Sequence, residues 1–172
     1  LVCDPILERI ETKLKTIKFN EIIDDKDINA VVVSSPAKTH FDLTKSLLEA
    51  DKNVFCEKPL CFTEKEVQIL TNLVHDKKKV FLSGHTFVFN DSIRFLKDYI
   101  EENELEFKTV FGKYSSFGTN VKDVNVLWDF GPHVISIMNF VLNSVPSEVN
   151  LYPISNREDG QLESCYLNLK YK

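Results

Sequence analysis

Short apolar runs alternate with helix-like segments through the first half of the chain. Three runs have the composition of parallel strands buried on both faces, and they lie at 28–33, 53–56 and 79–83. Apolar residues three or four positions apart predict helices at 5–17, 41–50 and 63–74. Thr63 and Glu66 form a capping-box pair at the start of the last helix. With the end of a further strand at Leu1–Asp4, this alternation predicts βαβ units around a parallel sheet.

The second half of the chain has a different pattern. Asp91 is placed to cap a helix that runs to about Glu102, and another helix is predicted from about Asp129 to Leu142. Strands are predicted at 107–117, 148–152 and 161–171. Two of these are longer and more polar than the strands of the first half, which favours an antiparallel sheet with one solvated face. The boundary between the two parts is therefore predicted near Asn90.

Composition and charge narrow the possible roles. Of the 172 residues, 43% are hydrophobic and 27% are charged, which is typical of a globular protein rather than a disordered one. The net charge is −5 and no block of Lys and Arg occurs, so the sequence argues against nucleic acid as a partner. No apolar run is long enough for a membrane span, and no signal-peptide pattern is present. We expect a cytoplasmic protein with no metal site and four reduced thiols: Cys3, Cys56, Cys61 and Cys165.

Ligands of parallel sheets bind beyond the carboxyl ends of the strands. This rule selects four loci: Asp4, Ser34–Pro36, Glu57–Pro59 and Gly84–His85. Lys58 draws attention because a lysine at such an edge can both donate and accept a proton. The alternative is an exposed Glu57–Lys58 pair in a loop. The three residues Glu57–Pro59, taken without their position in the chain, favour that alternative. The position at a strand end, followed by a proline that stiffens the turn, favours a functional lysine.

A second candidate for proton transfer is the pair Asp129 and His133. The two residues are four positions apart, so on a helix they share one face, and Pro132 suits a first helical turn. A carboxylate beside an imidazole orients the ring, as a proton shuttle requires. The alternatives are that Asp129 caps the helix and that His133 is a structural histidine.

The remaining strand-end residues suggest contacts with a dinucleotide. Asp4 could accept hydrogen bonds from a ribose and repel a 2′-phosphate, or it could start the helix that follows, and the two roles are compatible. The Ser34–Pro36 turn offers hydroxyls and backbone amides, whereas His40 is either a cofactor contact or a helix cap. No G-x-G-x-x-G sequence occurs, so this chain by itself predicts no phosphate cradle.

Four blocks in this order resemble the Gfo/Idh/MocA oxidoreductase family, which includes glucose–fructose oxidoreductase and inositol dehydrogenase. The blocks are Val31–Pro36, Thr39–His40, Asn53–Leu60 and Trp128–His133. The resemblance implies a Rossmann domain followed by an α+β domain with a mostly antiparallel sheet. It implies that the catalytic residues are Lys58, Asp129 and His133. It also implies the cofactor-binding residues Asp4, Ser34, Ser35, Pro36, His40, Glu57 and Lys58.

For function, the resemblance implies hydride transfer between a sugar hydroxyl carbon and a nicotinamide, with Asp4 favouring NAD over NADP. The runs Gly84–Asn90 and Val126–Asp129 look most like members that oxidise nucleotide-sugars at C3, which implies a UDP-sugar substrate. Val134 departs from the acidic residue that many members have after the histidine. An inositol or free-sugar dehydrogenase, or a non-catalytic dinucleotide sensor on the same fold, remains an alternative. The whole protein is expected to form a homo-oligomer.

The resemblance also predicts that the chain covers only part of the family fold. The first strand, glycine-rich turn and first helix of the family are expected to lie outside it, as is the later part of the second sheet. We therefore expect a partial Rossmann domain, lacking the first βα unit, over 1–90. A partial α+β substrate and oligomerisation domain is expected over 91–172. Without its phosphate loop, the chain alone is expected to bind no cofactor and to be inactive.

Overall fold

The computed structural model describes residues 1–6, 8, 11–12, 15–115 and 124–172. The chain divides into two compact units, Leu1–Gly84 and His85–Lys172, which are described separately below. The first unit contains parallel strands and the second an antiparallel pair. The mixed α/β class predicted from the alternation of apolar runs is therefore confirmed.

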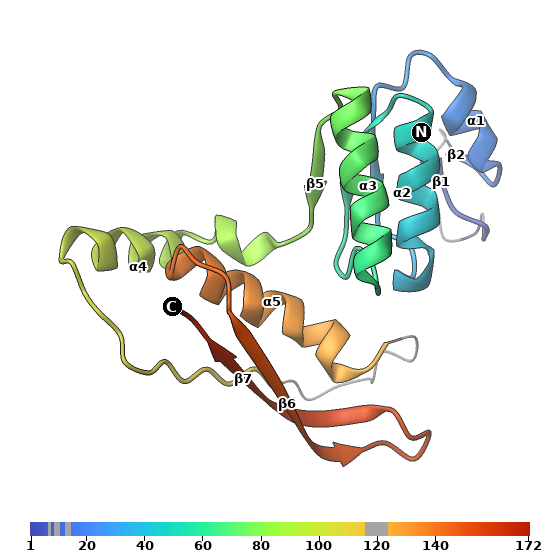
Figure 1. Cartoon of the computed structure of the whole chain (residues 1–172). Helices are drawn as coiled ribbons and strands as arrows, with labels where there is room; N and C mark the ends of the chain where they lie inside the picture. Colours follow the sequence, from blue (N-terminus) through green and yellow to red (C-terminus); the bar gives the residue numbers. More distant parts are fainter. Residues whose placement is uncertain (7, 9–10, 13–14, 116–123) are drawn as a thin grey trace. The chain divides into compact units, whose positions relative to one another are not determined.

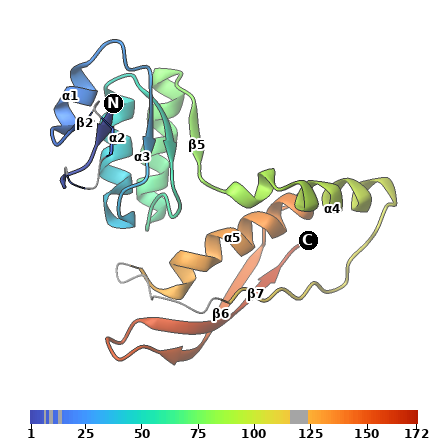
Figure 2. The ribbon, with the colours of Figure 1, turned by 180° about the vertical axis from the view of Figure 1, so that it is seen from behind.

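Three parallel strands organise the first unit. They stand in the order β3 (Ala30–Val33), β4 (Asn53–Cys56) and β5 (Phe81–Ser83). The chain passes from one strand to the next through α2 (His40–Glu49) and α3 (Glu64–Lys77). Figure 1 and the reverse view in Figure 2 show both helices over the same face of the sheet. The strands and these two helices are confirmed within a few residues of their predicted ends.

The core of the first unit lies between that face of the sheet and the helices. Its buried members are Ile22, Val33, Leu47, Leu48, Val54, Cys56, Cys61 and Leu70. Complete burial of one leucine stabilises the fold by about 1.5–3 kcal/mol. On the other face, Val32, Phe55 and Leu82 are paired in one row across the strands, and Val32 is 67% exposed. The prediction of strands buried on both faces is therefore wrong for this chain, because the described helices bury their side chains on one face only.

The start of the chain differs from the prediction. Strands β1 (Val2–Cys3) and β2 (Lys15–Thr16) form a separate parallel pair. The helix predicted over 5–17 is therefore wrong at its C-terminal end, where residues 15–16 form a strand. Positions 7, 9–10 and 13–14 of that helix lie outside the described residues. The short helix α1 (Phe19–Asp24) was not predicted. The spacing of apolar residues fails to predict β2 because a strand of two residues is too short to show the alternation of buried and exposed positions. Its buried residue, Thr16, is also polar.

The capping box at the start of α3 is confirmed in both directions. The hydroxyl oxygen of Thr63 accepts a hydrogen bond from the Glu66 amide at 3.2 Å, and the Glu66 carboxylate accepts one from the Thr63 amide at 3.0 Å. Two of the N–H groups that a helix start leaves without intrahelical partners are thus satisfied. This start fixes the direction in which the chain leaves the end of β4.

The second unit packs helices on an antiparallel pair of strands. Its elements are η3 (Thr86–Phe89), α4 (Asp91–Glu102), α5 (Val126–Val141), β6 (Glu148–Asn156) and β7 (Leu162–Lys170). Helix α5 contacts α4, η3 and β7. The antiparallel pairing of β6 with β7 confirms the prediction made from their length and polarity.

Two details of the second unit correct the sequence-based predictions. Asn90, not Asp91, caps α4, because its side chain accepts hydrogen bonds from the amides of Ser92 and Ile93 at 3.0 and 3.4 Å. Residues 107–115 of the strand predicted at 107–117 form no helix or strand, and 116–117 lie outside the described residues. A segment with strand-like composition needs a neighbouring strand to pair with, and in the part of the chain that the structure describes β6 and β7 pair only with each other.

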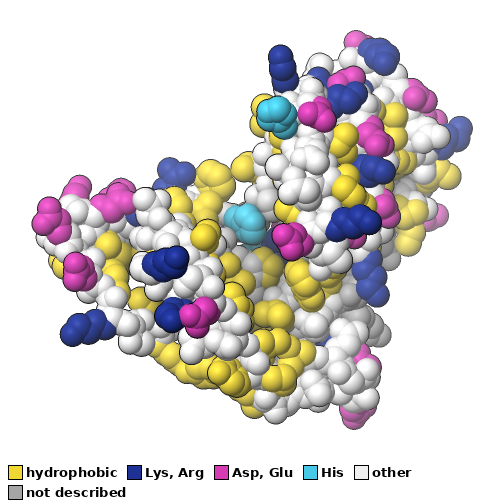
Figure 3. Space-filling view, in the orientation of Figure 1, with side chains coloured by type: hydrophobic (Ala, Val, Ile, Leu, Met, Phe, Trp, Pro, Cys, Tyr) yellow, Lys and Arg dark blue, Asp and Glu magenta, His cyan; other side chains and the backbone are white. Residues whose placement is uncertain are grey.

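Hydrophobic side chains remain exposed on the second unit. The β6–β7 pair exposes Val149 by 58% and Ile154 by 66%, and Figure 3 shows hydrophobic side chains gathered over this unit. Among the described residues, no helix is both long enough and apolar enough to cross a membrane.

Candidate functional site

The carboxyl ends of β3, β4 and β5 lie level at one edge of the sheet. The register pairs Val33 with Cys56 and Cys56 with Ser83. Beyond these pairs, the Glu57 amide donates to the Val33 carbonyl at 2.9 Å and the Gly84 amide donates to the Cys56 carbonyl at 2.8 Å. This pairing brings together three of the loci predicted from the sequence: Ser34–Pro36, Glu57–Pro59 and Gly84.

Lys58 lies in the turn between β4 and α3, and its main chain is held on both sides. Its amide donates a hydrogen bond to Oε2 of Glu57 at 3.2 Å. The carbonyl of the next residue, Pro59, contacts a ring nitrogen of His40 at 2.8 Å. The Lys58–Pro59 peptide bond is cis, and the Lys58 side chain is half-buried. The main chain at Lys58 is thus fixed at the end of β4.

The Ser34–Pro36 turn follows β3 and holds its own network of hydroxyls. The hydroxyl of Ser35 lies 2.6 Å from that of Thr39, which donates to the Pro36 carbonyl at 2.7 Å. Ser34 and Pro36 are exposed at the edge of the sheet. A ligand approaching this edge therefore meets an exposed hydroxyl and main-chain groups on a turn whose shape is fixed from within.

His40 is the most buried polar residue at this edge, with 1% of its surface exposed. Its Nδ1 lies 2.8 Å from the Pro59 carbonyl oxygen and its Nε2 lies 2.8 Å from the Ser35 carbonyl oxygen. The ring therefore spans two of the strand-end turns. The sequence left two roles open for His40, a cofactor contact or a helix cap, and neither includes this bridge between turns.

Asp4 is not joined to this edge by strand pairing. It follows β1, which is hydrogen-bonded to β2 and not to the three-stranded sheet. Its Oδ1 accepts a hydrogen bond from the Ile6 amide at 2.8 Å. This hydrogen bond closes a turn after β1, whereas the helix that Asp4 was predicted to start lies partly outside the described residues. The strand-end rule alone does not bring Asp4 to Ser34–Pro36.

Asp129 and His133 lie one turn apart on α5 and share one face of that helix, as predicted. Helix α5 begins at Val126 rather than near Asp129, and the Asn125 side chain caps it by accepting from the amides of Leu127 and Trp128 at 3.1 and 3.2 Å. The helix start therefore precedes Asp129, which is not the cap. Pro132 lies inside the helix rather than in its first turn, where it cannot donate the usual hydrogen bond to the preceding turn.

Aromatic side chains surround His133 within the second unit. The Phe87 ring meets the imidazole edge-on with 4.9 Å between centroids, and the Tyr114 ring is stacked on it at 5.9 Å. Tyr114 in turn packs on Phe130 at 4.7 Å. These contacts fix the plane of the imidazole ring. They were not predicted from the sequence, because Tyr114 is distant along the chain and lies where a strand was expected.

His85 begins the second unit, next to η3. Burial lowers the pKa of His85 from its ordinary value, because a buried imidazolium loses its hydration. Its Nδ1 has no hydrogen-bond partner among the described residues. The neutral ring is therefore the form that the fold favours at this position.

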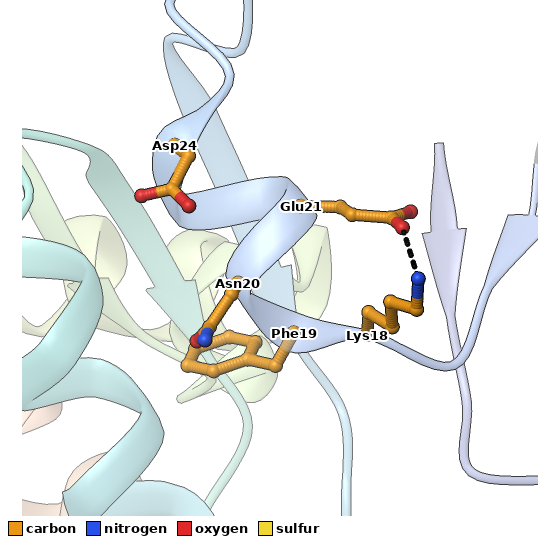
Figure 4. A pocket seen from close by; sticks show the side chains of 5 residues that line it. All are labelled: Lys18, Phe19, Asn20, Glu21 and Asp24. Atoms are coloured by element: carbon orange, nitrogen blue, oxygen red, sulfur yellow. Dashed lines mark ion pairs between the residues drawn. The ribbon is translucent and has the colours of Figure 1, made fainter.

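A shallow hollow of about 540 Å³ lies elsewhere in the first unit, on α1. Figure 4 shows its five lining side chains, Lys18, Phe19, Asn20, Glu21 and Asp24, with an ion pair between Lys18 and Glu21. It shares no residue with the strand-end edge and its ion pair is exposed. We therefore place the candidate site at the strand ends. No group of three His, Cys, Asp or Glu side chains with the geometry of a metal site occurs within the described ranges.

Residues 5–85, which include all three strand-end turns, match the model of an oxidoreductase family with an NAD-binding Rossmann fold, Gfo/Idh/MocA. Residues 5–85 of this chain therefore belong to the Gfo/Idh/MocA oxidoreductase family. The resemblance seen in four blocks of the sequence is thereby confirmed. The match extends to the end of the first unit and contains Ser34–Pro36, Glu57–Pro59 and Gly84.

Curated relatives are similar in sequence to this chain, and a solved structure has the same fold. The chain is 31% identical over 119 residues to levoglucosan dehydrogenase of Pseudarthrobacter phenanthrenivorans, a match that covers 69% of this chain and 28% of the relative. It is 25% identical over 165 residues to the NADP(+) scyllo-inositol 2-dehydrogenase of Bacillus subtilis, which covers 90% of this chain and 46% of the relative. The crystal structure of myo-inositol 2-dehydrogenase from Lactobacillus plantarum has the same fold, with a TM-score of 0.78 at 21% identity, over 98% of this chain and 57% of that one. The chain thus spans less than half the length of these two curated relatives.

Proposed function

We propose that the protein is a nicotinamide-dependent dehydrogenase acting on a hydroxyl-bearing carbon of a sugar or polyol. The observation that carries this proposal is the position of Lys58, whose main chain is fixed at the level carboxyl ends of three parallel strands. Family membership supplies the reaction class, and the relatives named above act on an anhydrosugar and an inositol by their names.

The strand-end edge of the first unit fits a dinucleotide. Ser34 is exposed there, the Glu57 carboxylate lies over the turn, and Gly84 has no side chain to obstruct an approaching ligand. Hydroxyl and carboxylate oxygens of this kind accept hydrogen bonds from ribose hydroxyls. Ser34, Ser35, Pro36, Glu57 and Lys58 are the residues that we assign to the cofactor side. The dinucleotide, when bound, supplies the hydride acceptor.

In this proposal, Lys58 is the acid–base group for the substrate hydroxyl. In its neutral form, Nζ of Lys58 takes the proton of the hydroxyl as the hydride leaves the adjacent carbon, and the proton returns in the reverse reaction. His133 holds or relays that proton, and Asp129 orients the imidazole or the sugar. The fixed ring plane of His133, between Phe87 and Tyr114, supports a directional role.

NAD is proposed as the cofactor in preference to NADP because Asp4 would repel a 2′-phosphate. A relative that carries NADP(+) in its name shows that dinucleotide preference differs among proteins similar to this one. In the full-length protein, Asp4→Ser is expected to lower KM for NADP relative to that for NAD. An unchanged ratio of the two KM values would count against the assignment of Asp4.

The proposed substrate is a UDP-sugar oxidised at C3, on the basis of the runs Gly84–Asn90 and Val126–Asp129. The second candidate is an inositol or a free sugar, which the names of the relatives favour. A panel of UDP-N-acetylhexosamines, inositols and simple hexoses, assayed by NADH formation, separates the two. Turnover of inositols alone would replace the nucleotide-sugar proposal by the second candidate.

The test of the acid–base assignment is Lys58→Ala in the full-length protein. Removing a positioned acid–base group costs about 10²–10⁴ in turnover, measured at saturating dinucleotide. Lys38→Ala is the matched control, because Lys38 is an exposed lysine of the same edge, in the turn that precedes α2. Turnover close to that of the unmodified protein in Lys58→Ala would contradict the assignment.

Binding of a dinucleotide with no turnover of any tested hydroxyl compound would instead favour a sensor on the same fold. Lys58 and His133 are both present, which supports the enzyme over the sensor. A homo-oligomer in the cytoplasm remains our expectation for the whole protein, and light scattering of the full-length protein tests its oligomeric state.

A further inference from the structure

The bridge made by His40 has a consequence for Lys58. Its ring lies between two carbonyl oxygens, one from each of two strand-end turns, at 2.8 Å on both sides. Burying a polar ring is costly unless it is hydrogen-bonded. A histidine that made no hydrogen bond at position 40 would therefore stabilise the fold less than a leucine there. The two carbonyl partners account for the presence of a polar residue at this position.

The chemistry of the contacts shows why they constrain the turns. A carbonyl oxygen only accepts hydrogen bonds, so each contact is a hydrogen bond when the facing ring nitrogen carries a proton. A neutral ring donates to one of the two turns, and a ring protonated on both nitrogens donates to both. In either form the planar ring sets the separation between the Ser35 and Pro59 carbonyls.

The position of Pro59 connects this bridge to the candidate acid–base group. Pro59 follows Lys58 directly, it is buried, and its carbonyl is the partner of Nδ1. On the other side, the Lys58 amide donates to Glu57. A hydrogen bond from a side chain outside the turn, that of His40, thus reaches the main chain next to Lys58. Both of its ring nitrogens face protein carbonyls, so neither is directed at a cofactor.

We infer that His40 is a positioning residue that holds the main chain of Lys58–Pro59 at the start of α2 through the Pro59 carbonyl, while the Ser35 carbonyl orients the ring. It acts through these two carbonyls and touches no reacting atom. The inference rests on the proposed function in one respect, namely that Lys58 is the acid–base group. A displacement of about 1 Å in a catalytic group can cost on the order of 10²-fold in turnover, so loss of the bridge should be visible in the rate.

Two substitutions separate the two halves of the bridge. In His40→Asn, the side-chain amide nitrogen takes the place of Nδ1 and can still donate to the Pro59 carbonyl. In His40→Gln, the longer side chain places its amide nitrogen near Nε2 and can still donate to the Ser35 carbonyl. His40→Leu fills similar volume and makes neither bond.

The first measurement is amide hydrogen exchange in the full-length protein, which does not depend on activity. We expect faster exchange at Lys58 and Leu60 in His40→Leu and His40→Gln, and exchange close to the original in His40→Asn. Leu48→Ala is the control, because Leu48 is fully buried on the same helix and contributes to the core rather than to the turns. Its cavity should speed exchange in α2 and the sheet without singling out Lys58 and Leu60.

The second measurement is steady-state kinetics on the same variants. Turnover in His40→Leu and His40→Gln is expected to fall on the order of 10²-fold with KM for the sugar unchanged, because the loss affects the reacting geometry and not substrate binding. His40→Asn should recover most of the turnover. Equal behaviour of the Asn and Gln variants, or exchange at Lys58 and Leu60 unchanged in His40→Leu, would overturn the inference. If Lys58→Ala keeps its turnover, the proposed function fails, and the exchange pattern still decides the role of His40.

Discussion

Gly84 lies so close to Glu57 that a Cβ built on it would be 2.9 Å from Oε2 and 3.1 Å from Cα of that residue. The contact occurs where β4 and β5 end, next to the hydrogen bond from the Gly84 amide to the Cys56 carbonyl. A side chain at position 84 would therefore push against main chain as well as carboxylate. Absence of a side chain at Gly84 is what lets the Glu57 carboxylate lie over the Lys58 amide.

Gly84→Ala is therefore expected to destabilise the protein by about 1–3 kcal/mol through overpacking. It should also weaken dinucleotide binding, because Glu57 must move. Urea unfolding and titration with NAD measure the two effects in the full-length protein. Gly112→Ala is the matched control, since its Cβ would meet only the flexible end of Met138 at 3.3 Å. Equal stability of the two variants would show that the edge of the sheet can open at little cost.

The cap of α5 gives a second prediction. Asn125 accepts from two amides at the start of the helix, and its carbonyl accepts from the Asp129 amide at 3.0 Å. Asn125→Ala should cost about 1 kcal/mol of stability, as loss of a helix cap typically does. Because the first turn includes Asp129, we also expect a loss of turnover.

Asn90→Ala is the control for that experiment, since Asn90 caps α4 by the same kind of hydrogen bonds. We expect a similar change in the urea midpoint for Asn90→Ala and Asn125→Ala, with reduced turnover in Asn125→Ala only. Loss of turnover in both variants would mean that the effect reflects general destabilisation rather than the position of Asp129.

Much of the candidate site follows from the sequence because it depends on local patterns. Short β-branched runs fix the strands, and parallel strands bring their ends to one edge whatever the loops contain. Ser34–Pro36, Glu57–Pro59 and Gly84 are therefore adjacent in the structure, as the sequence predicts. The pairing of Asp129 with His133 likewise needs only the period of a helix.

What the sequence does not predict depends on contacts between distant positions. The two carbonyl partners of His40 lie 5 and 19 residues away along the chain, and one lies before it and the other after it. The ring of Tyr114 reaches His133 from a segment that alternates like a strand but pairs with none among the described residues. The sequence predicts Asp91 as the cap of α4, whereas Asn90 has that role in the structure; both residue types cap helices well, so the backbone geometry decides.

His85 predicts a pH dependence of stability. Burial lowers the pKa of His85 in the folded state, so below its ordinary value of about 6.5 the unfolded chain binds a proton that the folded chain resists. The free energy of unfolding should therefore fall as the pH drops below about 6.5, and His85 should have no such effect at higher pH.

His85→Gln is expected to reduce the loss of stability between about pH 7.5 and about pH 5.5, as measured by urea unfolding at each pH. His75→Gln is the control, because the side chain of His75 is 90% exposed and lies in no buried environment. An identical pH dependence in His85→Gln and the unmodified protein would show that His85 is not the group responsible.

The four cysteines make a final prediction about reactivity. All four are free thiols in the structure. Burial raises the pKa of Cys61 to about 12 and also raises the pKa of Cys56, and both side chains belong to the core of the first unit. Cys3 and Cys165 are only partly buried. Since the thiolate is the reactive form, a disulfide reagent should modify the partly buried pair first.

The double variant Cys3→Ser, Cys165→Ser leaves only the two core thiols, Cys56 and Cys61. The rate at which a disulfide reagent labels these thiols then measures how often the core of the first unit opens to solvent. Its labelling at about pH 8 should be slow without denaturant, and it should accelerate with urea in parallel with the unfolding of the first unit. Fast labelling without urea would mean that Cys56 and Cys61 become accessible through local opening at the end of β4. In that case the Lys58 turn, which directly follows Cys56, would not be held as rigidly as its hydrogen bonds to Glu57 and His40 require.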